Sequence, residues 1–104
     1  MPRASETIVI SAGRDVLGVP MGDESWEYLK LTIETMLSNQ HALIVTNRAI
    51  GEGEYKGVKE ESATWVALVP NSTLDAIEEA LTAIAQLFKQ ESIAFMLVEY
   101  TKFC

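Results

Sequence analysis

Four short runs rich in β-branched and aliphatic residues alternate along the chain with two segments whose apolar residues recur at helical spacing. The runs predict strands over residues 7–12, 42–46, 64–69 and 92–100. The helical spacing predicts one helix over residues 24–39 and a second that begins after Pro70. Their apolar stripes are Trp26, Leu29, Ile33 and Leu37 in the first helix, and Leu74, Ile77, Leu81, Ile84 and Phe88 in the second.

The order of these elements, β-α-β-β-α-β, predicts an α+β fold of the ferredoxin-like type. In it, a four-stranded antiparallel sheet carries both helices on one face. The 104 residues suffice for a single domain, 1–104, in which we expect residues 1–6 to be a flexible tail. Asp23 or Ser25 is expected to cap the first helix and Ser72 the second. The glycine-rich stretch 49–59 predicts a long, mobile hairpin connection, and strand extensions at either end of it are an open alternative.

A sheet with helices on one face should alternate apolar and polar residues, and this one does not. In the third strand Trp65, Ala67 and Val69 point one way while Thr64, Val66 and Leu68 point the other, and the fourth strand is apolar in both directions. The apolar area of this second sheet face is larger than monomers usually leave exposed. The pattern therefore predicts a homo-oligomer in which another copy of the chain covers that face. The expected interface residues are Trp65, Ala67, Val69, Met96 and Val98.

Charge and composition narrow the range of partners. Acidic residues outnumber basic ones 15 to 8, giving a formal net charge of -7, which disfavours nucleic-acid and anionic-membrane surfaces. No apolar run approaches the roughly 20 residues that span a bilayer. The one cysteine, Cys104, has no internal disulfide partner, and no signal peptide is visible. A cytoplasmic protein is therefore expected.

No catalytic, metal-binding or cofactor-binding motif is present, so we predict no catalytic residue, no metal and no cofactor. His41 stands alone, without the second ligand that a metal site needs. Arg14 and Arg48 could hold a small anionic ligand. Glu60 and Glu61 lie next to a buried strand, where carboxylates could take part in acid–base chemistry. The segment 51–61 could act as a lid over such a site. The candidate ligand-binding residues are Arg14, Arg48, Tyr55, Glu60, Glu61 and Trp65. Surface ion pairs and a solvated loop are the simpler interpretation of the charged members.

Two segments resemble an uncharacterised family of small bacterial and phage proteins, catalogued as a domain of unknown function. They are Gly53-Glu54-Tyr55-Lys56-Gly57-Val58-Lys59-Glu60-Glu61-Ser62-Ala63-Thr64-Trp65 and Phe88-Lys89-Gln90-Glu91-Ser92-Ile93. The resemblance implies an α+β sandwich and a phage-encoded accessory protein. It supplies no activity and no catalytic residues.

Three functions are open from the sequence. The first is a non-enzymatic, homo-oligomeric binding module that holds a small ligand or a host protein at the sheet face or subunit junction. The second is a small-molecule enzyme that uses Glu60 or Glu61 with Arg14, Arg48 or His41. The third is an acidic decoy that blocks the basic site of a nucleic-acid-binding protein.

Overall fold

The computed structural model describes residues 5–55 and 58–98, with the backbone alone for residues 52–55 and 58–59. The strands are β1 (Ser5–Gly13), β2 (Asp15–Val16), β3 (Val19–Pro20), β4 (Leu43–Tyr55), β5 (Val58–Pro70) and β6 (Ala94–Val98). The helices are α1 (Asp23–Asn39), a 3-10 turn η1 (Asn71–Thr73) and α2 (Leu74–Leu87).

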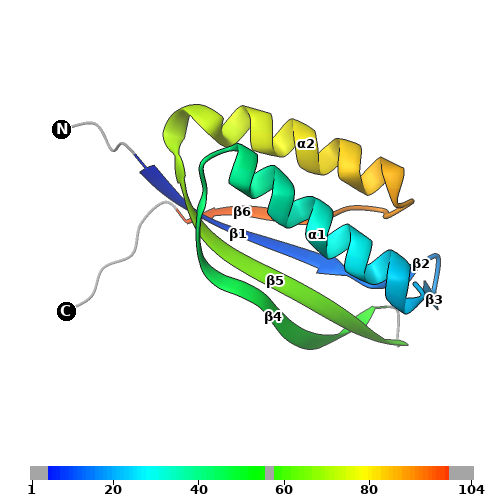
Figure 1. Cartoon of the computed structure of the whole chain (residues 1–104). Helices are drawn as coiled ribbons and strands as arrows, with labels where there is room; N and C mark the ends of the chain where they lie inside the picture. The colour runs from blue at the N-terminus through cyan, green and yellow to red at the C-terminus, as the bar shows by residue number, and fades with distance from the viewer. Residues whose placement is uncertain (1–4, 56–57, 99–104) are drawn as a thin grey trace, which may run out of the picture.

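The main sheet has the strand order β4-β5-β1-β6, and all neighbours in it are antiparallel. Both helices cover the same face of this sheet (Figure 1). If the two-residue strands β2 and β3 are set aside, the order along the chain is βαββαβ, so the predicted ferredoxin-like α+β fold is confirmed. Strands β5 and β1 are the two central strands of this sheet.

The core lies between the sheet and the helices. Alternate residues of β1 and β5 face it, because side chains along a strand point to opposite sides in turn. The helices contribute the predicted stripes, with Trp26, Leu29, Ile33 and Leu37 from α1 buried. The buried residues of the predicted stripe in α2 are Ile77, Leu81 and Ile84.

The connection predicted over residues 49–59 is strand for most of its length. β4 continues to Tyr55 and β5 begins at Val58, with Gly51 paired to Ser62 and Gly53 to Glu60. Glycine weakens a strand, but both of these glycines are paired with residues of β5, so the strand extensions that the sequence left open take up most of the stretch. Residues 56–57 lie outside the described part of the chain. The expected lid is therefore a two-stranded arm, and β1 takes in Ser5 and Glu6 of the expected tail.

The predicted helix caps are wrong. Helix α1 begins at Asp23 after Gly22, and α2 begins after Thr73, and in neither case does a side chain cap the first turn. The Asp23 carboxylate instead pairs with Arg14. Thr73 donates its hydroxyl to the Pro70 carbonyl, 2.7 Å away, so the chain turns out of β5 through η1 before the helix starts.

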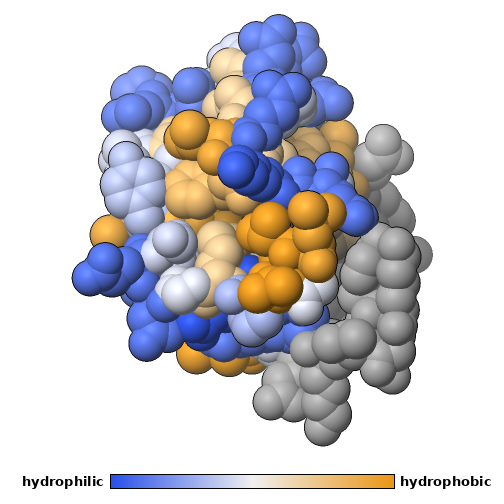
Figure 2. All heavy atoms as spheres, turned by 90° about the vertical axis from the view of Figure 1, so that its right-hand side faces the viewer, coloured by the Kyte–Doolittle hydropathy of each residue, from blue (hydrophilic) through white to orange (hydrophobic). Residues whose placement is uncertain are grey.

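A small hairpin, β2–β3, lies at one end of the molecule, beside the start of α1 (Figure 1). Its turn residues Leu17 and Gly18 both have positive φ, 52° and 82°, as a two-residue type I′ turn requires. Leu17 is 83% exposed and Val19 is 65% exposed. Figure 2 faces this end, where apolar side chains gather between hydrophilic ones.

Candidate functional site

The face of the sheet that the helices do not cover is called here the outer sheet face. The strand register divides it into two ends. Its apolar end contains Thr7 and Val9 of β1, Leu43 and Thr46 of β4, Val66 and Leu68 of β5, and Met96 and Val98 of β6. None of these residues is charged, Leu43 is 63% exposed and Met96 is 50% exposed. A contiguous exposed surface of this kind is typical of an interaction site.

The structure divides the expected interface residues between the two faces. Trp65 pairs with Ile10, which pairs with Phe95, so these three point toward the helices, and Trp65 is 0% exposed. Ala67 and Val69 are buried on that same face. These three therefore belong to the core, and the expectation that they lie at an exposed face is corrected. Met96 and Val98 do lie on the outer sheet face.

The polar end of the outer sheet face lies toward the tip of the β4–β5 arm. Ser11 and Thr64 face each other across β1 and β5, with their hydroxyl oxygens 3.2 Å apart. The Glu60 carboxylate lies against Gly13, where a Cβ atom would come within 1.9 Å of its Oε1. That oxygen accepts a hydrogen bond from the Asp15 backbone N–H at 3.1 Å. A carboxylate and hydroxyls thus lie on a glycine-containing surface next to the apolar end.

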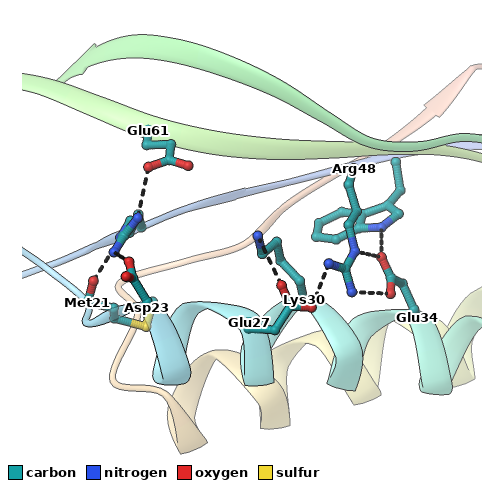
Figure 3. A network of polar contacts seen from close by, with 9 residues as sticks. Met21, Asp23, Glu27, Lys30, Glu34, Arg48 and Glu61 are labelled. Carbon is teal, nitrogen blue, oxygen red and sulfur yellow. Dashed lines mark hydrogen bonds and ion pairs between the residues drawn. The ribbon is translucent and has the colours of Figure 1, made fainter.

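Arg14 joins three segments on the helix side of the sheet, through its partners Met21, Asp23 and Glu61, which Figure 3 labels. Its guanidinium pairs with Asp23 at 2.6 Å and with Glu61 at 3.0 Å, and its Nε donates to the Met21 carbonyl at 2.7 Å. The hydrogen bond that Arg14 donates to Asp23, and then the one it donates to Glu61, raises the pKa of Arg14. Arg14 is thereby engaged in holding the end of β1 to β5 and to the start of α1.

Arg48 makes a second, separate network with α1 (Figure 3). Its Nε and a terminal nitrogen donate to the two oxygens of Glu34 at 2.5 and 2.8 Å, and its other terminal nitrogen pairs with Glu27 at 2.6 Å. The buried Trp65 indole donates to Glu34 Oε2 at 3.0 Å. Lys30 pairs with Glu27 at 3.6 Å.

The position of Arg48 depends on an irregularity of β4. Register shifts fall on either side of Thr46, and Arg48 itself has a positive φ of 54°. Bulges of this kind redirect side chains, and here the arginine reaches across to α1. The hydrogen bonds from Arg48, and then from Trp65, lower the pKa of Glu34 against the opposing effect of burial, and Glu34 in turn raises the pKa of Arg48.

The candidate residues therefore do not form one cleft. Glu60 and Glu61 point to opposite faces, as strand alternation predicts. The helix partners of the two arginines, Asp23 and Glu34, are eleven residues apart on α1, about 16 Å along its axis. His41 precedes the other end of β4, roughly 23 Å from Glu61 at about 3.3 Å per strand residue. Of the combinations proposed for an enzyme, only Arg14 with Glu61 is brought together.

Tyr55 lies on β4, but its side chain is outside the described residues. Within residues 5–55 and 58–98, no group of three or more His, Cys, Asp or Glu side chains is arranged to hold a metal ion. No helix in the same ranges is long and apolar enough to cross a membrane.

Sequence reasoning missed Glu34, the centre of the larger network. The available signal was a polar row on α1, Glu27, Lys30 and Glu34, spaced by three and four residues beside the apolar stripe. It also missed Ser11, Ser62 and Thr64 as outer-face neighbours of Glu60, because that grouping depends on the register between β1 and β5.

No protein-family model matches this chain, and no curated protein matches it in sequence. Solved structures resemble it in fold. A DUF3240 family protein from Shewanella baltica OS155 has a TM-score of 0.58 and 11% identity, covering 99% of each chain. A phage SAM lyase in complex with S-methyl-5′-thioadenosine has a TM-score of 0.58 and 18% identity, covering 95% of this chain and 84% of the lyase.

An unknown protein from Galdieria sulphuraria has a TM-score of 0.56 and 12% identity, and the match covers 94% of this chain but 50% of that one. At these identities the likeness is one of fold alone. The expected resemblance to an uncharacterised family is thus met at the level of fold, by the DUF3240 protein.

Proposed function

We propose that this chain is the subunit of a homo-oligomeric protein that binds a small molecule, and that copies associate through the apolar end of the outer sheet face. The observation that carries the proposal is the exposed, uncharged surface around Leu43 and Met96. Two copies of a chain with a net charge of -7 repel each other, so they need a contact surface free of carboxylates. The apolar end is such a surface.

The polar end of the outer sheet face is the proposed ligand site, and it borders the subunit contact. Its charged group among the described residues is Glu60, whereas Arg14 and Arg48 are already paired with carboxylates. These features favour a neutral or cationic ligand that carries hydroxyl donors, in place of the anionic ligand expected from the arginines. Carboxylates recognise ribose hydroxyls in nucleotide-binding proteins. The fold likeness to a SAM lyase bound to S-methyl-5′-thioadenosine supports a ligand of this nucleoside class.

A second candidate function is cleavage of S-adenosylmethionine (SAM), and the same fold likeness favours it. The Glu60 carboxylate would attract the sulfonium cation and could take a proton from the carbon next to the one that carries the sulfur. The electron pair of that C–H bond would form a C=C bond as the C–S bond breaks, and S-methyl-5′-thioadenosine would leave as a neutral thioether. The proposed binding site is shared by both functions, so they differ only in turnover. The acidic decoy stays a prediction, because nothing in the structure or the comparisons concerns its partner.

Sedimentation velocity at about 10 μM, well above a micromolar Kd, tests the assembly. We expect the wild type to sediment as an oligomer and the Val9→Asp variant (V9D), with a charge at the apolar end, as a monomer. Val19→Asp (V19D), equally acidic but on the β2–β3 hairpin, is the matched control and should remain oligomeric. A monomeric wild type, or equal behaviour of the two variants, contradicts the proposed junction.

Isothermal titration with S-methyl-5′-thioadenosine and with SAM tests the ligand site. Glu60→Gln (E60Q) should weaken binding about tenfold, the cost of one hydrogen bond to a charged group, while Glu24→Gln (E24Q), on an exposed part of α1, should bind normally. Chromatography of a SAM incubation then separates the two functions. Formation of S-methyl-5′-thioadenosine above the buffer control identifies an enzyme, and binding without turnover identifies the binding module. Failure of both compounds to bind contradicts the ligand class.

A further inference from the structure

The two edges of the sheet differ in how they are protected. Edge strands usually carry charges, prolines or bulges that discourage pairing with another chain. β4, at one edge, has register shifts on either side of Thr46 and carries Arg48, Glu52 and Glu54. β6, at the other edge, reads Ala-Phe-Met-Leu-Val and pairs with β1 in continuous register. Over residues 94–98, β6 therefore has none of these protective features.

A groove lies along the helix side of the β6 edge. Its volume is about 380 Å³, within the range of ligand-binding clefts. Leu81 and Ala85 of α2 line it together with Phe95 of β6 and with Ile93, which directly precedes β6. Phe95 pairs with Ile10 and so points toward the helices. Helix α2 thus overhangs a space in which the side chains of one more strand would fit.

The polar residues around the groove are acidic or neutral. Glu78 of α2 and Glu91, before β6, line it, and neither lysine nor arginine is among its lining residues. Asp75 and Glu79 are exposed further along the same helix. This charge opposes a second copy of an acidic chain and favours a basic partner.

We propose that an extended segment of another protein, with alternating apolar and basic residues, adds to the sheet as a fifth strand along β6. Backbone hydrogen bonds to the outer edge of β6, which pairs only with β1 among residues 5–55 and 58–98, supply affinity, and side chains on the helix side enter the groove, as in other cases of strand addition. Lysine or arginine residues of the segment meet Glu78, which is exposed at the groove. This inference goes beyond the proposed function, because it requires neither the outer sheet face nor a small molecule.

The probe is a synthetic peptide of alternating valine and lysine with a central threonine, titrated into the isotopically labelled full chain and followed by NMR. We expect amide shifts and slowed hydrogen exchange in residues 94–98. Glu78→Lys (E78K) reverses a charge at the groove and should weaken binding by about twofold to fivefold, by the measured range of exposed charge pairs. Glu79→Lys (E79K), the adjacent residue outside the groove lining, is the matched control and should bind as the wild type does. Thr82→Trp (T82W), which fills the groove, should also weaken binding.

Three outcomes overturn the inference. The first is binding of a glutamate-for-lysine version of the peptide as tightly as the basic one. The second is equal loss of binding in E78K and E79K. The third is exchange protection of residues 94–98 that rises with protein concentration in the absence of peptide, because the β6 edge would then belong to a second copy of this chain. None of these depends on whether SAM or S-methyl-5′-thioadenosine binds.

Discussion

Replacing Glu34 with alanine (E34A) removes the acceptor for both Arg48 and the Trp65 indole. Trp65 is 0% exposed, so its N–H would be left in the core without a partner. A buried unsatisfied donor costs about 1–3 kcal/mol. The bidentate pair with Arg48 is partly exposed, with 17% and 27% of the two side chains accessible, so solvent screening limits it to about 1 kcal/mol. The sum predicts a loss of about 2–4 kcal/mol in the free energy of unfolding.

Urea unfolding followed by tryptophan fluorescence and circular dichroism measures this loss. In thermal unfolding followed by circular dichroism, the same loss should lower the Tm of E34A by roughly 10–20 °C for a domain of this size. Arg48→Ala (R48A) should cost less, because Glu34 keeps the indole as a partner. Glu24→Ala (E24A), an exposed acidic residue on the same helix, is the control and should change stability by no more than about 0.5 kcal/mol. If E34A were no more destabilising than E24A, the network would contribute nothing to stability and the reasoning would be refuted.

Three further predictions concern other features of the chain. The folded pKa of Glu34 lies below the ordinary value of 4.5, so its contribution to stability is present above that pH and is lost as pH falls through the folded pKa. When the free energy of unfolding is measured against pH, the Glu34→Gln variant (E34Q) should lack this part of the acid-side slope that the wild type shows. Gly13→Ala (G13A) should cost about 0.5–1.5 kcal/mol, since its Cβ displaces the Glu60 carboxylate from the Asp15 N–H, and in the Glu60→Ala (E60A) background the cost should shrink, which a double-mutant cycle in urea can detect. Leu17→Asn (L17N) should raise Tm by about 2–6 °C, because asparagine tolerates positive φ better than leucine does; an unchanged or lowered Tm would speak against strain at the hairpin turn.

The arrangement of elements was predictable because it depends on local pattern. Two helical stripes and four β-branched runs in the order βαββαβ leave few simple folds, and the predicted one is present. The lengths of β4 and β5 were not predictable in the same way. Gly51 and Gly53 weaken a strand in isolation, but each pairs across the arm with a residue of β5. Tertiary pairing therefore overrides local propensity along the arm.

The candidate site was predictable only in part, because side-chain partners depend on register. Alternation shows that Trp65 and Val66 point apart, but both are apolar, and nothing local says which one faces the helices. Which residues of β5 and β6 point to the same face of the sheet is likewise set by the register of each strand with their shared neighbour β1. Arg14 and Glu61 were singled out as candidates for ligand binding, and the structure pairs them with each other. The bulge that directs Arg48 toward Glu34 leaves no signature in the sequence.

The position of β1 in the sheet has a consequence for synthesis of the protein. Both of its neighbours, β5 and β6, are translated later, and the first contact, Gly13 with Ser62, spans almost half the chain. A nascent chain that ends within β4 has no strand with which β1 can pair. β1 can pair with β5 along its whole length only after translation has passed residue 70, and the four-stranded sheet is complete only after residue 98. A fragment that stops before β5 would leave a strand rich in isoleucine and valine open to aggregation.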